Sequence, residues 1–299
     1  MEKKQLPERL VKVLEILTAF LKAGLAVLIL EAADYAAAFA MIGMKIDLGI
    51  YKGVYSLLAS ALSLIGLYIF SRVEGKITNG KRSDLIKFNR ISVQQALSTI
   101  TIAFALLAVV TTYMMLVRVI GTAMEPVKEA VGEYDASMQT YDTSSPYPLW
   151  DQLLYVVGLT FFVPAAEEFA FRGLIYGSIN RSMNVAWSIG ISSVIFGVMH
   201  GLSVHIGYAL MSGIILGLSY YAFDSVFATI LIHGIFNFFG SGIYNLCDAL
   251  GVDRQGIVGL YTMQFVMILP AGMLLAHYAS ARYKMNGIRP DGGELCEQA

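Results

Sequence analysis

The chain has 299 residues, of which 57% are hydrophobic and 14% are charged, and its mean hydropathy is +0.64. Soluble domains carry about 25% charged residues, so this composition excludes an ordinary soluble globular protein. The 21 Lys and Arg residues nearly balance the 22 Asp and Glu residues, which leaves no basic surface for nucleic acid. The two cysteines, Cys247 and Cys296, are too few for a disulfide framework or a four-thiolate zinc site.

A membrane-spanning helix needs about 20 mostly apolar residues, and the chain contains about eight such stretches. Their hydrophobic runs are continuous rather than alternating, which excludes the strands of an outer-membrane barrel. We therefore predict an all-α, polytopic membrane protein that forms one integral domain over residues 1–299. The predicted spans are residues 17–44, 51–71, 92–118, 150–180, 185–203, 206–223, 225–244 and 257–279.

The distribution of cations predicts the orientation, because cytoplasmic loops carry an excess of Lys and Arg. Such residues precede the first span and crowd the joint after the second, so both segments are expected in the cytoplasm. The acidic segment 119–149 is then expected to be an extracytoplasmic loop, and an even number of spans places both termini in the cytoplasm. We expect an integral protein of a prokaryotic cell membrane.

Ionisable residues inside a membrane are costly and mark candidate functional sites. Glu167 and Glu168 interrupt the fourth predicted span, and Arg172 follows Glu168 at the i,i+4 spacing that favours an ion pair on one helix face. The two adjacent glutamates point about 100° apart, so Glu167 is expected to face a different neighbour. Pro164 lies one turn earlier and predicts a bend beside the carboxylates.

Two histidines lie in apolar spans, and each has a partner four residues away. Asn237 follows His233 on the same helix face, and Phe196 precedes His200, where its ring can orient the imidazole. At 1.5 Å per residue, Glu167, His233 and Asn237 fall at similar depths, whereas His200 falls higher in the membrane. Paired glycines, Gly197 with Gly201 and Gly213 with Gly217, indicate close packing of helices.

These groups suit hydrolysis of an amide bond. Glu167 is a candidate base, a histidine and the asparagine are candidate donors to an oxyanion, and the second histidine can orient water or shuttle a proton. Two histidines and a glutamate are also a zinc ligand set, although no HExxH pattern occurs. A third interpretation is a structural network in which the buried polar groups satisfy one another.

Three motifs carry a resemblance to a known family. EExxxR spans Glu167 to Arg172, FxxxH spans Phe196 to His200, and HxxxN spans His233 to Asn237, in that order. The pattern resembles the CPBP family of intramembrane proteases, also called the Abi family, which includes type II CAAX prenyl endopeptidases and bacteriocin-processing proteins. The resemblance covers roughly residues 150–245, which we take as the expected catalytic core.

The resemblance implies a bundle of about eight membrane helices around an intramembrane cavity, where a glutamate activates water without a cofactor. By position, Glu167 would be the catalytic base, supported by Glu168 and Arg172. His200 would help place the water, and His233 with Asn237 would stabilise the oxyanion. The implied activity is that of an intramembrane endopeptidase acting on a membrane-associated peptide or protein, including prenylated CAAX-type substrates.

Other functions remain open from the sequence. The same family contains proteins that confer immunity or bind signalling partners without demonstrated cleavage, so a non-catalytic binding role is the main alternative. Transport is disfavoured because the chain shows no internal repeat, although Glu31 and Asp34 lie three residues apart on one helix face. Zinc remains the alternative to the cofactor-free mechanism.

Overall fold

The computed structural model describes residues 7–77, 85–138, 147–201, 204–252 and 258–287. Within these ranges the chain is helical, and an isolated bridge between Phe88 and Ser225 is the extended pairing present. The α-helices are α1 (Glu8–Gly43), α2 (Lys52–Ile77), α3 (Val93–Gly121), α4 (Glu125–Met138), α5 (Leu149–Val157), α6 (Val163–Glu168), α7 (Gly177–Asn180), α8 (Val185–Met199), α9 (Val204–Phe223), α10 (Val226–Asn237), α11 (Ile243–Leu250), α12 (Val258–Val266) and α13 (Ile268–Gly287).

Three π-helical segments are inserted among these helices: η2 (Gly158–Phe162), η3 (Phe169–Tyr176) and η4 (Phe238–Gly242). The first two lie within one continuous helix that runs from α5 to α7. A π-helical turn closes across five residues instead of four, and such turns are rare in proteins and frequently occur at functional sites. Their presence on both sides of the two glutamates marks this helix as unusual.

Among the residues that the structure describes, six helices are long and apolar enough to cross a membrane. They cover Glu8–Gly43, Lys52–Ile77, Val93–Gly121, Leu149–Asn180, Val204–Phe223 and Val226–Leu250. The prediction of an all-α polytopic membrane protein is confirmed, and the chain is an integral membrane protein.

The two remaining predicted spans differ from the six. The fifth is the shorter helix Val185–Met199, and the eighth is divided into α12 and α13 by a turn at Met267. The predicted fifth span, 185–203, was therefore too long at its C-terminal end. Length and apolarity thus identify six candidate crossings among the described residues, which is close to but fewer than the eight predicted.

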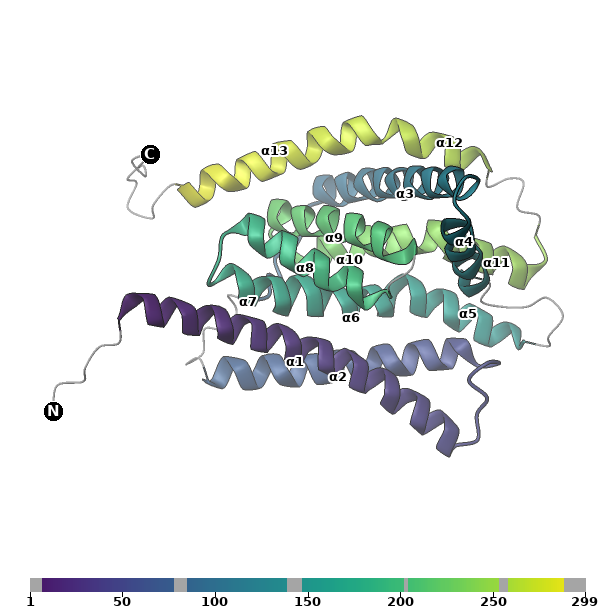
Figure 1. Ribbon diagram of the computed structural model, residues 1–299, viewed down its shortest axis with the longest axis horizontal. Helices are drawn as coiled ribbons and strands as arrows, with labels where there is room; N and C mark the ends of the chain where they lie inside the picture. The colour runs from purple at the N-terminus through teal and green to yellow at the C-terminus, as the bar shows by residue number, and fades with distance from the viewer. Residues whose placement is uncertain (1–6, 78–84, 139–146, 202–203, 253–257, 288–299) are drawn as a thin grey trace.

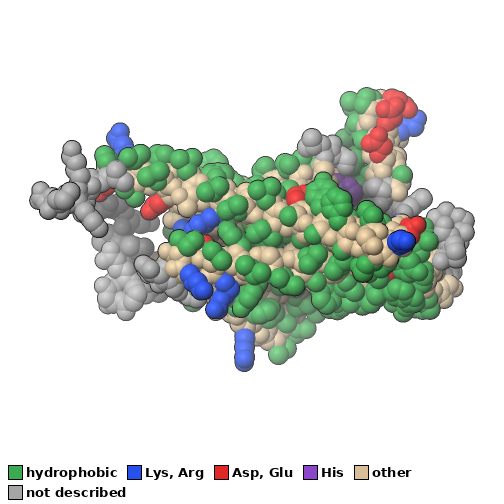
Figure 2. All heavy atoms as spheres, turned by 90° about the horizontal axis from the view of Figure 1, so that it is seen from below, with side chains coloured by type: hydrophobic (Ala, Val, Ile, Leu, Met, Phe, Trp, Pro, Cys, Tyr) green, Lys and Arg blue, Asp and Glu red, His purple; other side chains and the backbone are tan. Residues whose placement is uncertain are grey.

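Most helices run along the long axis of the molecule (Figure 1). The α1–α2 pair lies at one side, and α3 with α12 and α13 lies at the other. Between them are α8, α9, α10 and the continuous helix from α5 to α7, so the helices that carry the three motifs are central. Hydrophobic side chains cover most of the face formed by α1 and α2, as expected of a surface in contact with lipid (Figure 2).

Two clusters of buried hydrophobic residues flank the centre. One joins α1, α2, η3, α8 and α9 around Phe171, Leu174 and Phe196. The other joins α3, α9, α10 and α13 around Ile102, Leu106 and Ile232. The polar motif residues lie between these clusters, where packed neighbours on both sides fix their helices.

Small residues allow α8 and α9 to approach closely. A Cβ atom on Gly213 would lie 2.9 Å from the Cβ of Ser193, and one on Gly217 would lie 3.1 Å from Ile189. The packing role predicted for this glycine pair is therefore present. Gly201 differs, because its φ of +89° and open surroundings identify it as a turn residue rather than a packing residue.

The segment predicted as an acidic loop, 119–149, contains helix α4, while residues 139–146 lie outside the described ranges. Arg118 at the end of α3 binds both carboxylate oxygens of Asp135 at 2.8 and 2.6 Å. Lys128 and Glu125 form a second pair at the i,i+3 spacing. The acidic residues therefore support a helix through local ion pairs, which charge composition alone does not reveal.

Candidate active site

Glu167 and Glu168 end α6, immediately between the two π-helical segments of the continuous helix. Glu168 is completely buried and Glu167 is 22% exposed, so the two adjacent carboxylates occupy different environments. Pro164 stands at the start of α6, directly after η2. The helix next to the predicted bend thus contains a π-helical turn that precedes the glutamates.

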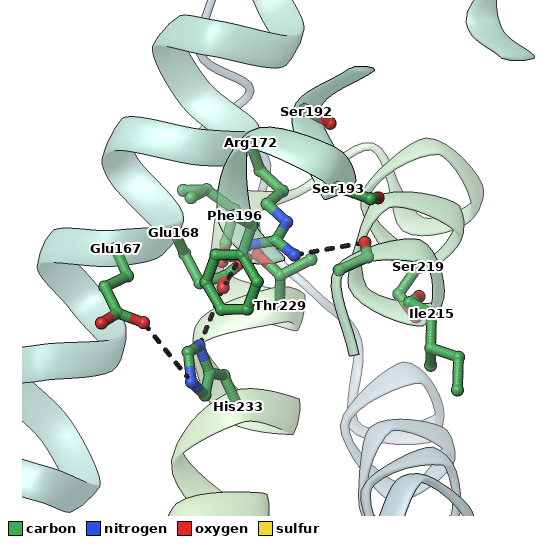
Figure 3. A network of polar contacts seen from close by, with 12 residues as sticks. Glu167, Glu168, Arg172, Ser192, Ser193, Phe196, Ile215, Ser219, Thr229 and His233 are labelled. Atoms are coloured by element: carbon green, nitrogen blue, oxygen red, sulfur yellow. Dashed lines mark hydrogen bonds and ion pairs between the residues drawn. The ribbon is translucent and has the colours of Figure 1, made fainter. Parts of the chain in front are cut away.

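The predicted ion pair between Glu168 and Arg172 is present inside the protein. Arg172 Nη1 lies 2.8 Å from Glu168 Oε1, and both side chains are nearly inaccessible. The guanidinium also donates to the backbone carbonyl of Gly213 at 3.2 Å and lies 4.7 Å from the centre of the Phe196 ring. Arg172 therefore neutralises Glu168 and anchors it to α8 and α9 (Figure 3).

His233 on α10 faces both glutamates through its two ring nitrogens. Its Nδ1 lies 2.9 Å from Glu168 Oε1, and its Nε2 lies 3.7 Å from Glu167 Oε2 (Figure 3). A carboxylate only accepts hydrogen bonds, so the hydrogen lies on Nδ1 of His233, which donates the hydrogen bond to Glu168. Glu168 thus pairs with Arg172, as expected, and Glu167 faces a different neighbour, His233, which also contacts Glu168 through its other ring nitrogen.

His200 occupies the C-terminal end of α8 rather than the middle of a span. The helix ends at Met199 and the chain turns at Gly201, so His200 lies at the helix terminus. Its Nδ1 contacts the Phe196 carbonyl at 2.8 Å, and the two rings lie 4.4 Å apart between centroids. Phe196 thus holds the imidazole through its backbone as well as its ring.

Asn237 ends α10, one turn after His233. Its side-chain Nδ2 donates to the backbone carbonyl of Leu159 at 3.1 Å, across to the π-helical segment η2. Gly234 lies between His233 and Asn237, and a Cβ atom there would collide with the carbonyl of Thr160. The absence of a side chain at Gly234 is what lets α10 approach η2 so closely.

Two cavities meet at this group of residues. One of about 720 Å³ opens toward α1 and α2 and is lined by Glu31, Asp34 and Tyr55 as well as Glu167 and His200. The other, of about 460 Å³, lies toward α3 and α9 and includes His233 and Asn237 in addition to Glu167 and His200. Glu167 and His200 belong to both walls, so they stand where the cavities adjoin.

The depth estimate, which counted residues from assumed span ends, placed His200 higher in the membrane than Glu167. In the structure His200 and Glu167 line the same two cavities. The structure brings together all seven predicted residues: Glu167, Glu168, Arg172, Phe196, His200, His233 and Asn237.

Charge separates the two glutamates. The Oε2 atoms of both side chains are buried without a hydrogen-bond partner among the described residues, but the charge of Glu168 is compensated by Arg172 through Oε1. The 3.7 Å distance to His233 Nε2 is longer than a hydrogen bond. No group of three or more His, Cys, Asp or Glu side chains within the described ranges is placed to hold a metal ion.

Two contributors to the site were missed in the sequence. The carbonyl of Leu159 acts through the backbone, which residue types do not report, although the nearby Pro164 was a signal that a carbonyl is freed. Tyr155 lines both cavities one helical turn before Leu159, and its aromatic side chain in an apolar run gave no distinguishing pattern.

The comparison with protein families bears on this part of the chain. Residues 149–239 match the family model described as type II CAAX prenyl endopeptidase, Rce1-like. This segment is therefore similar to that family. The match agrees with the CPBP resemblance of the three motifs, and the matched segment includes every one of the seven residues above. No curated protein and no solved structure matches the chain.

Proposed function

We propose that the protein is an intramembrane endopeptidase in which Glu167 activates water to cleave a membrane-associated substrate. The observation that carries the proposal is the state of Glu167. Its Oε2 lacks a hydrogen-bond partner among the described residues, yet it lies where two cavities meet and near His233. Its neighbour Glu168 is instead neutralised by Arg172.

The reaction proceeds in two steps. The Glu167 carboxylate removes a proton from water while the water oxygen attacks the carbonyl carbon of the substrate, which forms a tetrahedral oxyanion. The protonated Glu167 then donates that proton to the leaving nitrogen as the carbon–nitrogen bond breaks. The products are a carboxylic acid and an amine, and Glu167 returns to its starting state.

The other residues assist through their hydrogen-bonding atoms. His200 donates through Nδ1 to Phe196, so its Nε2 is available to accept a hydrogen bond from the water. Asn237 has a second amide hydrogen beyond the one given to Leu159, and it donates to the oxyanion. His233, held by Glu168 at Nδ1, contributes an Nε2–H to the oxyanion when its ring is protonated.

The family description names prenylated CAAX proteins, and this substrate class is part of the proposal. The cavities, of about 720 and 460 Å³, fall in the range of pockets that hold small ligands or short peptide segments. A substrate that is itself embedded in the bilayer reaches them without crossing water.

The test is proteolysis by purified protein in liposomes. A farnesylated CAAX peptide and a set of membrane peptides are incubated with wild type and with Glu167→Gln, and new termini are read by mass spectrometry. Wild type is expected to cleave and Glu167→Gln to lose activity. Glu129→Gln, the same chemical change on the exposed face of α4, is the matched control and should cleave like wild type.

Cleavage by Glu167→Gln at the wild-type rate would refute the assignment of the base. Absence of cleavage by wild type across all substrates would count against a protease and favour the binding role, in which case the co-purifying membrane protein becomes the next object of study.

A further inference from the structure

The backbone hydrogen bonds of η2 stop at Pro164. The amide of Val163 donates to the Gly158 carbonyl five residues earlier, which is the π-helical pattern. The next bond of the same series would run from residue 164 to the Leu159 carbonyl. Proline has no amide hydrogen, so the helix cannot supply that bond. Leu159 therefore offers its carbonyl to a donor outside the series.

Asn237 takes this position. Its Nδ2 donates to the Leu159 carbonyl at 3.1 Å, from a helix 78 residues further along the chain. The close approach at Gly234, whose Cα lies against the Thr160 carbonyl, brings the two backbones near enough for this short side chain to reach. A freed backbone carbonyl, a glycine contact and an asparagine thus occur together at one crossing of helices.

This contact fixes which way the carboxamide of Asn237 points. A carbonyl oxygen only accepts, so the nitrogen side of the carboxamide must face Leu159. One of the two amide hydrogens is used there, and the other remains on the same nitrogen. Asn237 and Glu167 line the same cavity of about 460 Å³, so the second amide hydrogen of Asn237 is available to a substrate in that cavity.

We propose that Pro164 and the Leu159 carbonyl are positioning elements for Asn237: the missing amide of the proline frees the carbonyl that aims the carboxamide nitrogen at the substrate oxyanion. The inference rests on the proposed function, since it assigns a purpose to the Asn237 donor. It differs from a general bending role of proline, because it predicts that Pro164 and Asn237 act through one hydrogen bond.

Pro164→Ala supplies the amide that the wild-type helix lacks. The new N–H lets an α- or π-type bond form to Thr160 or Leu159, which draws the carbonyls back toward the helix axis and away from Asn237. Alanine is compatible with a helix, so the variant is expected to fold. Pro270→Ala is the control, because Pro270 lies in the first turn of α13 and lines neither of the two cavities.

The first experiment measures kcat and KM for cleavage by wild type, Asn237→Ala, Pro164→Ala and the double variant. Loss of one oxyanion donor typically lowers kcat by about 10²–10³. Misplacing it through Pro164→Ala is expected to lower kcat by about 10–100-fold with KM unchanged, since small displacements of catalytic groups carry penalties of this size. The double variant should match Asn237→Ala alone, because the two changes remove the same interaction.

A second measurement does not depend on activity. The melting temperature in detergent should fall by about 2–4 °C in Asn237→Ala when residue 164 is proline, as expected for one hydrogen bond. The same substitution in the Pro164→Ala background should cause a smaller fall, because the bond is already lost. Pro270→Ala should leave the effect of Asn237→Ala unchanged.

The outcomes separate the two proposals. A wild-type kcat in Pro164→Ala, multiplicative losses in the double variant, or equal melting shifts in both backgrounds would each overturn the positioning role. If Glu167→Gln retains full cleavage, the proposed function fails, and the coupling of melting temperatures still decides whether Pro164 controls the Leu159–Asn237 contact.

Discussion

Replacing Arg172 by alanine is expected to destabilise the protein strongly. The guanidinium is 1% exposed and holds the completely buried Glu168 carboxylate at 2.8 Å. It also donates to Gly213 and contacts the Phe196 ring, so its removal deletes contacts between the α5–α7 helix and both α8 and α9. The larger consequence is a carboxylate left in a low-dielectric interior without its counter-charge.

The magnitude follows from what remains around Glu168. Removing one member of a buried ion pair costs about 3–5 kcal/mol, because the partner charge stays buried. His233 Nδ1 still donates to Glu168 at 2.9 Å and offsets part of that cost. We therefore expect a loss near the lower limit, about 3 kcal/mol, which corresponds to a fall in melting temperature of roughly 6–12 °C.

The assay is thermal unfolding in detergent, with Arg118→Ala as the control. Arg118 makes a two-oxygen contact with Asp135, but these side chains are 49% and 44% exposed. Exposed pairs of this kind contribute about 0.2–1 kcal/mol. A loss in Arg172→Ala no larger than that in Arg118→Ala would show that burial of the Glu168–Arg172 pair does not govern its contribution.

Three further predictions follow from the same structure. A strong chelator should leave proteolysis unchanged if Glu167 alone activates water, and loss of activity that added zinc restores would instead support a metal mechanism. Gly213→Ala should lower the free energy of unfolding by about 1–3 kcal/mol, because the new Cβ would lie 2.9 Å from the Cβ of Ser193. The control is Gly190→Ala on α8, which should be neutral or stabilising because no atom lies within 4 Å of its new Cβ. Equal melting temperatures for the two variants would contradict this prediction. The Arg118 guanidinium lowers the pKa of Asp135, so the pair stabilises α4 fully above the unfolded carboxyl pKa and progressively less as pH falls through the lower folded pKa. The assay is hydrogen exchange of the α4 amides, measured relative to the intrinsic rate at each pH. Their protection should decrease as pH falls in wild type. A similar decrease in Asp135→Asn would argue against a role for this ion pair.

The sequence predicted the site better than it predicted the paths of the helices. The i,i+4 spacing of Glu168 and Arg172 and the order of the three motifs were sufficient to name residues that the fold brings together. These predictions depend on local spacing, which survives changes in helix geometry. The same reasoning did not reveal that Glu167 and Glu168 converge on His233, because that depends on where a helix 65 residues further along the chain crosses.

The failures have identifiable physical causes. His200 was placed higher than Glu167 because the estimate counted residues from assumed span ends, yet the two side chains line the same cavities. The helix within the acidic segment 119–149 was missed because charge composition was weighed above the local ion pairs of α4. The role of the Leu159 carbonyl could not be predicted directly, since every residue type has the same backbone carbonyl.

The π-helical turn η2 also has a consequence for how this chain is compared with others. A turn that closes across five residues holds one residue more than the α-helical equivalent, so everything after Phe162 is displaced by one position relative to an ordinary helix. Deleting a single residue between Gly158 and Phe162 would convert this segment to an α-helical turn and leave Glu167 facing the same way relative to α5. An alignment with a protein that has a regular helix here therefore needs a one-residue gap, and without that gap every residue on one side of it is paired with the wrong partner.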